Sequence, residues 1–286
     1  MALNLDAIGK KIGPITRTYT WRDVIIYALG IGSGFGELNY VYEKNLKVIP
    51  TFSIASIVQF FFEACRQANV NLAGVLHGGQ ELIFHRSIPT SGTMATEGMI
   101  THFYDKKEKG AIIIGESDTF HSNGEKLFTA IFNIFSRLDG GFGGDDDPLR
   151  KASMPERNAD MRVAALPSPD QPLLYRLSGD VFELHVDPEF ARKAGFEKPI
   201  MHGLCTLGYA CRALVASLVP GMPEMVRRLN CRFTRPLYPG DPIETDIWKT
   251  KEGKAVWRTK NVKTGETVID GGEFEYGEIP KSILKA

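Results

Sequence analysis

Residues 53–68 read SIASIVQFFFEACRQA, and residues 201–218 read MHGLCTLGYACRALVASL. Each stretch follows a proline, Pro50 or Pro199, and each is so apolar that it predicts a helix buried on most of its sides. A sheet that is apolar on one face must cover that face, and a buried helix can provide the cover. The two stretches therefore predict two helices, each wrapped by a curved sheet.

Runs with strand-like composition follow both predicted helices, with polar and glycine turns between them. Segments such as KKEKG at 106–110 and KTGET at 263–267 are typical of hairpin connections. The pattern predicts an α+β fold in which each long helix is followed by an antiparallel meander. The expected strands cover 76–86, 93–104, 110–119 and 124–136, and then 227–235, 242–249, 253–262 and 266–278.

The chain repeats itself at a shift of about 149 residues, with its landmarks in the same order in both halves. Between the halves, about residues 139–160 are rich in Gly, Asp and Pro and predict a linker over the surface. We expect an N-terminal half at 1–138 and a C-terminal half at 161–286. The glycines at 30–36 and 140–144 lack the spacing of a nucleotide-binding loop and predict flexible turns. In the repeat, Pro50 aligns with Pro199, Phe84 with Phe233 and Arg86 with Arg235.

The composition excludes several classes of partner. The chain has 34 basic and 34 acidic side chains, so no net field attracts it to nucleic acid or to an anionic membrane. Its four cysteines have no CxxC spacing and lie in apolar stretches, which predicts reduced core thiols. No apolar run reaches the roughly 20 residues of a membrane span, and the N-terminus lacks the pattern of a signal peptide. We expect an intracellular protein.

The segment YRLSGDVFELHVDP holds an acid and an imidazole five residues apart, Asp180 and His185. In the first half the equivalent positions carry Gly32 and, near His185, Gly36 and Glu37. An acid and an imidazole around one cavity can hold the same water and perform general acid–base catalysis. The sequence thus predicts one catalytic half and one retired copy. The residues alone leave a second interpretation open, in which Asp180 caps a turn and His185 is a hydrogen-bonded core histidine.

His202 and Gly203 lie at the predicted start of the second long helix. The unpaired N–H groups and the positive end of the helix dipole favour a carbonyl oxygen that gains negative charge there. Gly203 would allow a ligand to approach the backbone closely. The spacing leaves open that this glycine only permits tight packing of the helix.

Other kinds of site are less consistent with the sequence. Asp180, His185, Asp187 and His202 could supply metal ligands, but no H-x-x-x-H or H-E-x-x-H pair occurs, so we expect no metal. The sequence also has no G-x-S-x-G elbow, which argues against a serine hydrolase.

At these residues the sequence resembles the MaoC-like hydratase 2 family of hot-dog enzymes, which includes the hydratase part of peroxisomal multifunctional enzyme type 2. The resemblance covers nearly the whole chain. It implies a double hot-dog fold in which the two halves pack as a pseudo-dimer. The second half carries it in YRLSGD, LHVDPEFARKAGFEKPIMHGLCTLG and RFTRPLYPGD, and the first half in YALGIG, YVYEKNLKVIPTF, VLHGGQEL and GGFGG.

The resemblance also implies an activity, the reversible syn addition of water to a trans-2-enoyl-CoA to give the (3R)-3-hydroxyacyl-CoA. Asp180 and His185 would activate the water, and the N–H of Gly203 would bind the thioester oxygen. No cofactor is implied, because CoA is part of the substrate. The implied CoA and substrate contacts are His77, Gly78, Lys106, His202 and Phe233, although Lys106 alone would suggest a solvated turn.

The resemblance implies a peroxisomal location, yet the C-terminal KSILKA is not an SKL-type signal, which leaves the cytoplasm as the alternative. Self-association into a homodimer is a reasonable expectation for such paired halves.

Two positions depart from the family pattern G-D-x-N-P-L-H, because this chain reads GDVFELH, with Glu183 in place of the proline. Phe182 stands where asparagine is expected, and a phenyl ring can neither donate nor accept the hydrogen bonds of an amide. This departure keeps open an acyl-CoA-binding protein without catalysis. A thioesterase of the same fold is a separate alternative.

Overall fold

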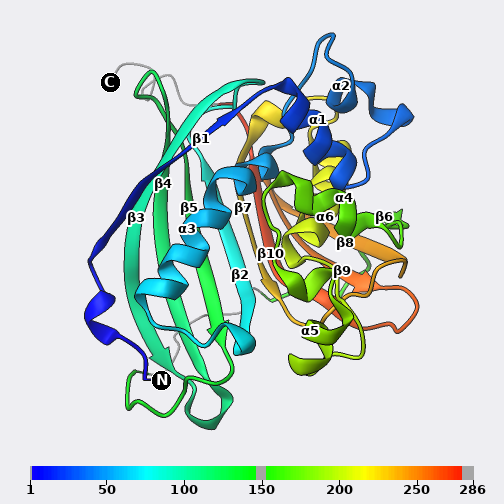
Figure 1. Cartoon of the computed structure of the whole chain (residues 1–286). Helices are drawn as coiled ribbons and strands as arrows, with labels where there is room; N and C mark the ends of the chain where they lie inside the picture. Colours follow the sequence, from blue (N-terminus) through cyan, green and yellow to red (C-terminus); the bar gives the residue numbers. More distant parts are fainter. Residues whose placement is uncertain (1, 146–152, 279–286) are drawn as a thin grey trace.

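The computed structural model describes residues 2–145 and 153–278 (Figure 1). The described strands form one ten-stranded sheet in which all neighbouring strands are antiparallel, in the order β1-β3-β4-β5-β2-β7-β10-β9-β8-β6. Five strands come from each half of the chain. Their bounds are β1 Lys11–Tyr19, β2 Val75–Phe84, β3 Gly92–Asp105, β4 Ala111–His121, β5 Lys126–Ser136, β6 Met161–Ala165, β7 Val226–Phe233, β8 Ile243–Lys251, β9 Lys254–Asn261 and β10 Thr267–Tyr276.

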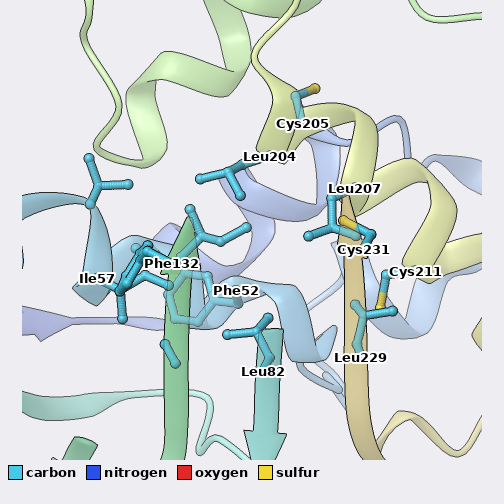
Figure 2. Packing of buried hydrophobic residues seen from close by; sticks show 14 of the residues in the cluster. Phe52, Ile57, Leu82, Phe132, Leu204, Cys205, Leu207, Cys211, Leu229 and Cys231 are labelled. Carbon is cyan, nitrogen blue, oxygen red and sulfur yellow. The ribbon is translucent and has the colours of Figure 1, made fainter. Parts of the chain in front are cut away.

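The two halves join where β2 pairs with β7 at the centre of the sheet. Leu82 of β2 lies opposite Leu229 of β7, and both side chains are fully buried. Figure 2 shows these two leucines side by side below Leu204 and Leu207. Because main-chain hydrogen bonds and a shared core both cross this seam, we expect the halves to behave as one packed unit.

The sheet order corrects the expected meander. The eight strands predicted after the helices are present, but β2 lies beside β5 and not beside β3. Residues 85–91 carry the chain from the middle of the sheet to its outer part, where β3, β4 and β5 follow one another as hairpins. The second half has the same arrangement, since β7 lies beside β10 and the hairpins join β8, β9 and β10. This crossing leaves one edge of β2 available to pair with β7, a long-range choice that no local sequence signal specifies.

The two long helices are α3 (Ile54–Gln67) and α6 (Gly203–Leu218), as the apolar stretches predict. Helix α3 contacts β1, β3, β4 and β5, and α6 contacts β6, β7 and β8. Figure 1 shows each helix lying against the strands of its own half. Most residues of α6 are buried, which explains why its sequence is apolar on nearly every side.

Several elements ahead of the long helices were not predicted. They include the edge strands β1 and β6 and four short helices. A capping box begins α1, since Thr20 N–H donates to Asp23 Oδ2 over 2.8 Å. The T-x-x-D pattern of the sequence is a signal for such a helix start. The short helices are α1 Trp21–Gly30, α2 Leu38–Val41, α4 Gln171–Tyr175 and α5 Pro188–Lys193.

The four cysteines are free and buried, as predicted. Figure 2 shows Cys205, Cys211 and Cys231 within the apolar packing around α6 and β7. Burial raises the pKa of each of these thiols above its usual range, which keeps them protonated and unreactive. Across the described residues, no helix is both long and apolar enough to cross a membrane.

The glycine-rich start of the expected linker is held in place, which corrects the prediction of a flexible turn there. The Asp105 carboxylate accepts hydrogen bonds from the backbone N–H groups of Gly141 and Gly143, over 2.8 Å and 2.7 Å. Phe142 packs against the main core. These contacts fix residues 139–145 beside the β3–β4 hairpin, and residues 146–152 of the expected linker lie outside the described residues.

Candidate active site

Asp180 follows a tight turn at the end of the 3-10 helix Arg176–Ser178. Gly179 has a φ of 132°, and a Cβ there would lie 2.6 Å from the Arg17 guanidinium, so a larger residue would strain this turn. The carboxylate of Asp180 then accepts a hydrogen bond from Phe182 N–H over 3.3 Å. A one-turn 3-10 helix at Glu183–His185 brings His185 back toward it. The D-x4-H spacing thus gives a compact loop with the acid and the imidazole close together.

The His185 ring is oriented by a backbone contact. Its Nδ1 lies 2.9 Å from the carbonyl oxygen of Ile200, which can only accept, so Nδ1 carries the proton and Nε2 is left as an acceptor. One oxygen of Asp180 and one ring nitrogen of His185 lie within 4.8 Å of each other. A water that makes two hydrogen bonds of about 2.8 Å joins atoms about 4.5 Å apart. The pair can therefore hold one water between them.

Burial sets the charge state of this pair. It raises the pKa of Asp180, although the neighbouring His185 opposes the shift. It lowers the pKa of His185, against the opposing effect of Asp180. A carboxyl group with a raised pKa and an imidazole with a lowered pKa exchange protons at little cost, which is what an acid–base pair needs to take a proton and return it.

The structure places His202 behind the loop of residues 180–185. It is fully buried, and its ring stacks on His185 with centroids 3.8 Å apart. Its Nε2–H donates to the backbone carbonyl of Asp180 over 3.1 Å. His202 is not among the residues that line the cavity, which corrects the expectation that it touches the substrate. It orients the loop and the His185 ring instead.

A cavity of about 400 Å³ opens beside the acid and the imidazole. Asp180, His185 and the backbone of Gly203 lie at its wall, and the rest of the wall is mostly apolar and comes from both halves. Such a concave, largely apolar site with a few polar groups is typical of a pocket for a small ligand. Its aromatic lining consists of Phe61, Phe62, Phe132, Phe135, Phe182, Phe196 and Phe233.

Gly203 is the first residue of α6, so its N–H has no carbonyl one turn earlier to bond with. A Cβ at this position would lie 3.2 Å from the Phe233 ring, and both residues line the cavity. A larger residue would push into the ring and cover the N–H. The positive end of the helix dipole can thus act on an oxygen in the cavity.

The N-terminal half contributes His77 and Gly78, both on β2 and both in the cavity wall. Burial lowers the pKa of His77 to about 4. Its ring stacks on Phe61 at 5.1 Å and meets Phe233 edge-on at 5.2 Å, while its Nε2 is buried without a hydrogen-bond partner. Lys106 begins the β3–β4 turn, and it is not among the lining residues. Of the expected contacts, the cavity therefore joins His77, Gly78, Gly203 and Phe233.

The equivalent place in the first half is filled by side chains from α6. A Cβ on Gly32 would lie 2.5 Å from the hydroxyl of Tyr209, and Glu37 is ion-paired with Arg212. Ile54 begins α3 where Gly203 begins α6. The first half therefore offers neither an acid–imidazole pair nor a glycine at its helix start, and that it is a retired copy stays a prediction.

Phe182 packs where the family pattern has asparagine. Its ring lies 5.2 Å from Phe190, 5.8 Å from Phe62 and 6.3 Å from His185. The ring extends the apolar wall toward the imidazole and offers no hydrogen bond. Meanwhile the backbone N–H of Phe182 still orients Asp180, and the Ile200 carbonyl still orients His185. Backbone groups thus hold the side chains of Asp180 and His185 without the amide.

Asp180, His185 and His202 also form a group whose ligand atoms lie within 4.8 Å of one another. His185 Nδ1 and His202 Nε2 donate to carbonyl oxygens, which leaves one nitrogen of each ring as an acceptor. Asp187, the fourth candidate from the sequence, instead caps α5 by accepting from Glu189 N–H over 2.7 Å. That the site works without a metal stays a prediction.

Three buried histidines predict how stability depends on pH. The pKa values of His77, His185 and His202 are all lowered by burial. Below about pH 6.5 the unfolded chain therefore binds protons that the folded chain does not, and the free energy of unfolding falls as the pH is lowered toward 4. His77 alone contributes about 3 kcal/mol to this loss. The raised pKa of Asp180 has the opposite effect, because it favours the folded state as the pH falls. This single group opposes the three histidines, so we expect a net loss of stability.

Urea unfolding between pH 7.5 and pH 4.5 measures the effect. The exposed His102 provides the control, since a His102→Gln variant should show the same slope as the wild type. A free energy of unfolding that stays constant over this interval would contradict the assignment of three neutral buried imidazoles.

Two family models match the chain, one in each half. A model described as the MFE-2 hydratase 2 N-terminal domain matches residues 18–138, and the MaoC like domain matches residues 150–271. The chain is 38% identical over 287 residues to the probable enoyl-CoA hydratase 2 of Dictyostelium discoideum, with 97% of each chain covered. The chain belongs to the MaoC-like hydratase 2 family.

Two further members of this MaoC-like group support the assignment. The 3-hydroxyacyl-thioester dehydratase Y of Mycobacterium tuberculosis is 36% identical, over 96% of this chain and 99% of that one. The crystal structure of a MaoC-like dehydratase from Phytophthora capsici superposes with a TM-score of 0.83 at 31% identity, covering 96% of this chain and 99% of that one. The α+β double hot-dog fold expected from the sequence is confirmed.

Proposed function

We propose that this protein is a (3R)-specific trans-2-enoyl-CoA hydratase, which also works in reverse as a 3-hydroxyacyl-CoA dehydratase. The observation that carries the proposal is the meeting of Asp180, His185 and the N–H of Gly203 at one apolar cavity. The relatives named as an enoyl-CoA hydratase 2 and a 3-hydroxyacyl-thioester dehydratase support the same reaction.

The geometry suggests how each group contributes. Asp180 and His185 hold a water between them, and its oxygen bonds to C3 of the enoyl thioester as the pair takes up one of its protons. The electron pair of the C2–C3 double bond moves toward the thioester carbonyl, whose oxygen gains charge beside the N–H of Gly203. The pair then returns a proton to C2 on the same face, which gives syn addition and restores the site.

The apolar wall supports this chemistry in two ways. It binds the acyl part of the substrate through the rings of both halves. It also excludes bulk water, which strengthens the interaction of the Gly203 N–H with a developing oxyanion.

The test is to follow the loss of enoyl absorbance with crotonyl-CoA and with a medium-chain enoyl-CoA, together with an assay for free thiol. Hydration consumes the enoyl absorbance without releasing thiol. Thiol release would instead indicate the thioesterase alternative. Tight binding of the CoA ester without any turnover would indicate the noncatalytic alternative.

Phe182→Asn tests whether the departure from the family pattern weakens the enzyme. Backbone groups already orient both catalytic side chains, so we expect the turnover number of Phe182→Asn to stay within about tenfold of the wild type, a difference of 1.4 kcal/mol or less in the barrier. Steady-state kinetics with crotonyl-CoA measures this. A much larger gain in turnover would mean that Phe182 disables the site.

Other predictions from the sequence stand as proposals beside this function. They are the absence of a cofactor other than the CoA of the substrate, the formation of a homodimer, and a peroxisomal location.

A further inference from the structure

Arg137 lies in the wall of the same cavity as Asp180 and His185. It is the first residue after β5, and its backbone N–H donates to Gly74 O over 3.0 Å. Its side chain reaches across to the C-terminal half, where Nη2 donates to the carbonyl of Ala194 over 2.8 Å. The guanidinium lies 5.6 Å from the ring of Phe196, which also lines the cavity. Two contacts thus fix the direction of this cation.

No carboxylate among the described residues pairs with Arg137. Its Nε is buried and has no hydrogen-bond partner. The acid nearest in sequence, Asp139, is occupied elsewhere, since it accepts from Ser136 Oγ over 2.5 Å and from Asn71 N–H over 3.0 Å. A partly buried cation without a counter-charge is costly. A ligand that brought an anionic group to this part of the cavity would remove that cost.

The surroundings of Arg137 favour a phosphate over an anion on the acyl group. Gly110 ends the β3–β4 turn, and a Cβ there would lie 2.8 Å from the Cα of Arg137. The same turn carries Lys107 and Lys109 with Glu108 between them, all exposed to solvent, so its net charge is positive. Arg137 therefore stands where the cavity wall meets a basic hairpin. A ligand that runs from the catalytic pair out to solvent would carry its phosphates here.

We propose that Arg137 binds a phosphate of the carrier arm of the thioester substrate, the CoA part, and so positions the thioester for hydration. This inference rests on the proposed function. A guanidinium matches phosphate oxygens in a planar, two-pronged geometry. Nη2 already donates to the Ala194 carbonyl, which leaves Nη1 of the fork for a phosphate oxygen. Arg137 acts on binding and leaves the proton transfers to Asp180 and His185.

The experiment compares Arg137→Gln with the wild type on four crotonyl thioesters of decreasing length: those of CoA, dephospho-CoA, phosphopantetheine and pantetheine. A hydrogen bond between charged groups contributes about 1.5–3 kcal/mol. We therefore expect kcat/KM to fall about 10- to 100-fold with the CoA ester, mainly through KM. The pantetheine ester has no phosphate, and we expect the two proteins to hydrate it equally. The shortest ester for which Arg137→Gln has a lower kcat/KM than the wild type shows which phosphate Arg137 binds.

Two variants serve as controls. Arg137→Lys keeps the charge without the planar guanidinium. Its kcat/KM with the CoA ester should fall less than that of Arg137→Gln. Arg22, an exposed cation stacked on Trp21, is the matched arginine outside the cavity, and Arg22→Gln should behave as the wild type with all four esters.

Two results would overturn the proposal. They are an equal loss of kcat/KM with all four esters and no loss with any of them. If the wild type hydrates no thioester, the proposed function is contradicted, and the role of Arg137 needs a separate test. Calorimetric binding of CoA then tests Arg137 separately, with weaker binding by Arg137→Gln supporting its role and equal binding contradicting it.

Discussion

Replacing Asp180 by asparagine is expected to lower the turnover number for crotonyl-CoA hydration by about 10²–10⁴-fold, the usual contribution of one acid–base group. Asparagine keeps the shape of the side chain and can still accept from Phe182 N–H, but it cannot take up and return a proton. We therefore expect KM to change little. Steady-state kinetics on the purified variant gives both values.

Asp187 provides the matched control for this variant, because it is an acid of the same segment that caps α5. Asparagine is also a good N-cap, so Asp187→Asn should keep the activity of the wild type. If Asp180→Asn retained full turnover, Asp180 would be only the capping residue of a turn.

His185→Gln is expected to lower the turnover number by a similar factor of about 10²–10⁴. Glutamine can donate to the Ile200 carbonyl as Nδ1–H does now, yet its amide is not a base. The stack of His185 on His202 is lost as well. The variant should therefore bind the thioester but not hydrate it. Parallel measurements of binding and turnover separate the two effects, and His102→Gln controls for the loss of an exposed histidine.

Unchanged turnover in His185→Gln would leave Asp180 as the sole acid–base group. An equal loss of binding and turnover would mean that the substitution collapses the cavity wall, of which His185 is a part.

Local sequence patterns predicted the parts of the fold that depend on local physics. The apolar stretches gave α3 and α6 because a helix that is wrapped on most sides must be apolar on most sides. Turn residues separated eight strands whose bounds agree with the structure within about three residues. The order of the strands depends on pairing between distant segments, and nothing within β2 distinguishes β5 or β7 from β3 as a neighbour.

The candidate site was predictable to the same degree. Asp180 and His185 could be selected because the repeat offers Gly32 and Glu37 in their place. The position of His202 behind the loop depends on the fold that returns α6 to residue 180. Arg137 carries no signal of its own, since a single arginine after a strand is usually exposed. Its importance comes from contacts with Ala194 and Phe196, nearly 60 residues away.

The configuration of the product formed from trans-2-enoyl-CoA tests the account most directly. Incubation of the wild-type protein with crotonyl-CoA, followed by chiral separation of the hydrolysed product, reports both the addition of water and the face that it attacks. We predict (3R)-3-hydroxybutyrate from the wild type and almost none from Asp180→Asn. A (3S) product, or no hydroxy acid from a folded wild-type protein that binds the ester, would contradict the assignment of Asp180 and His185 as the water-activating pair.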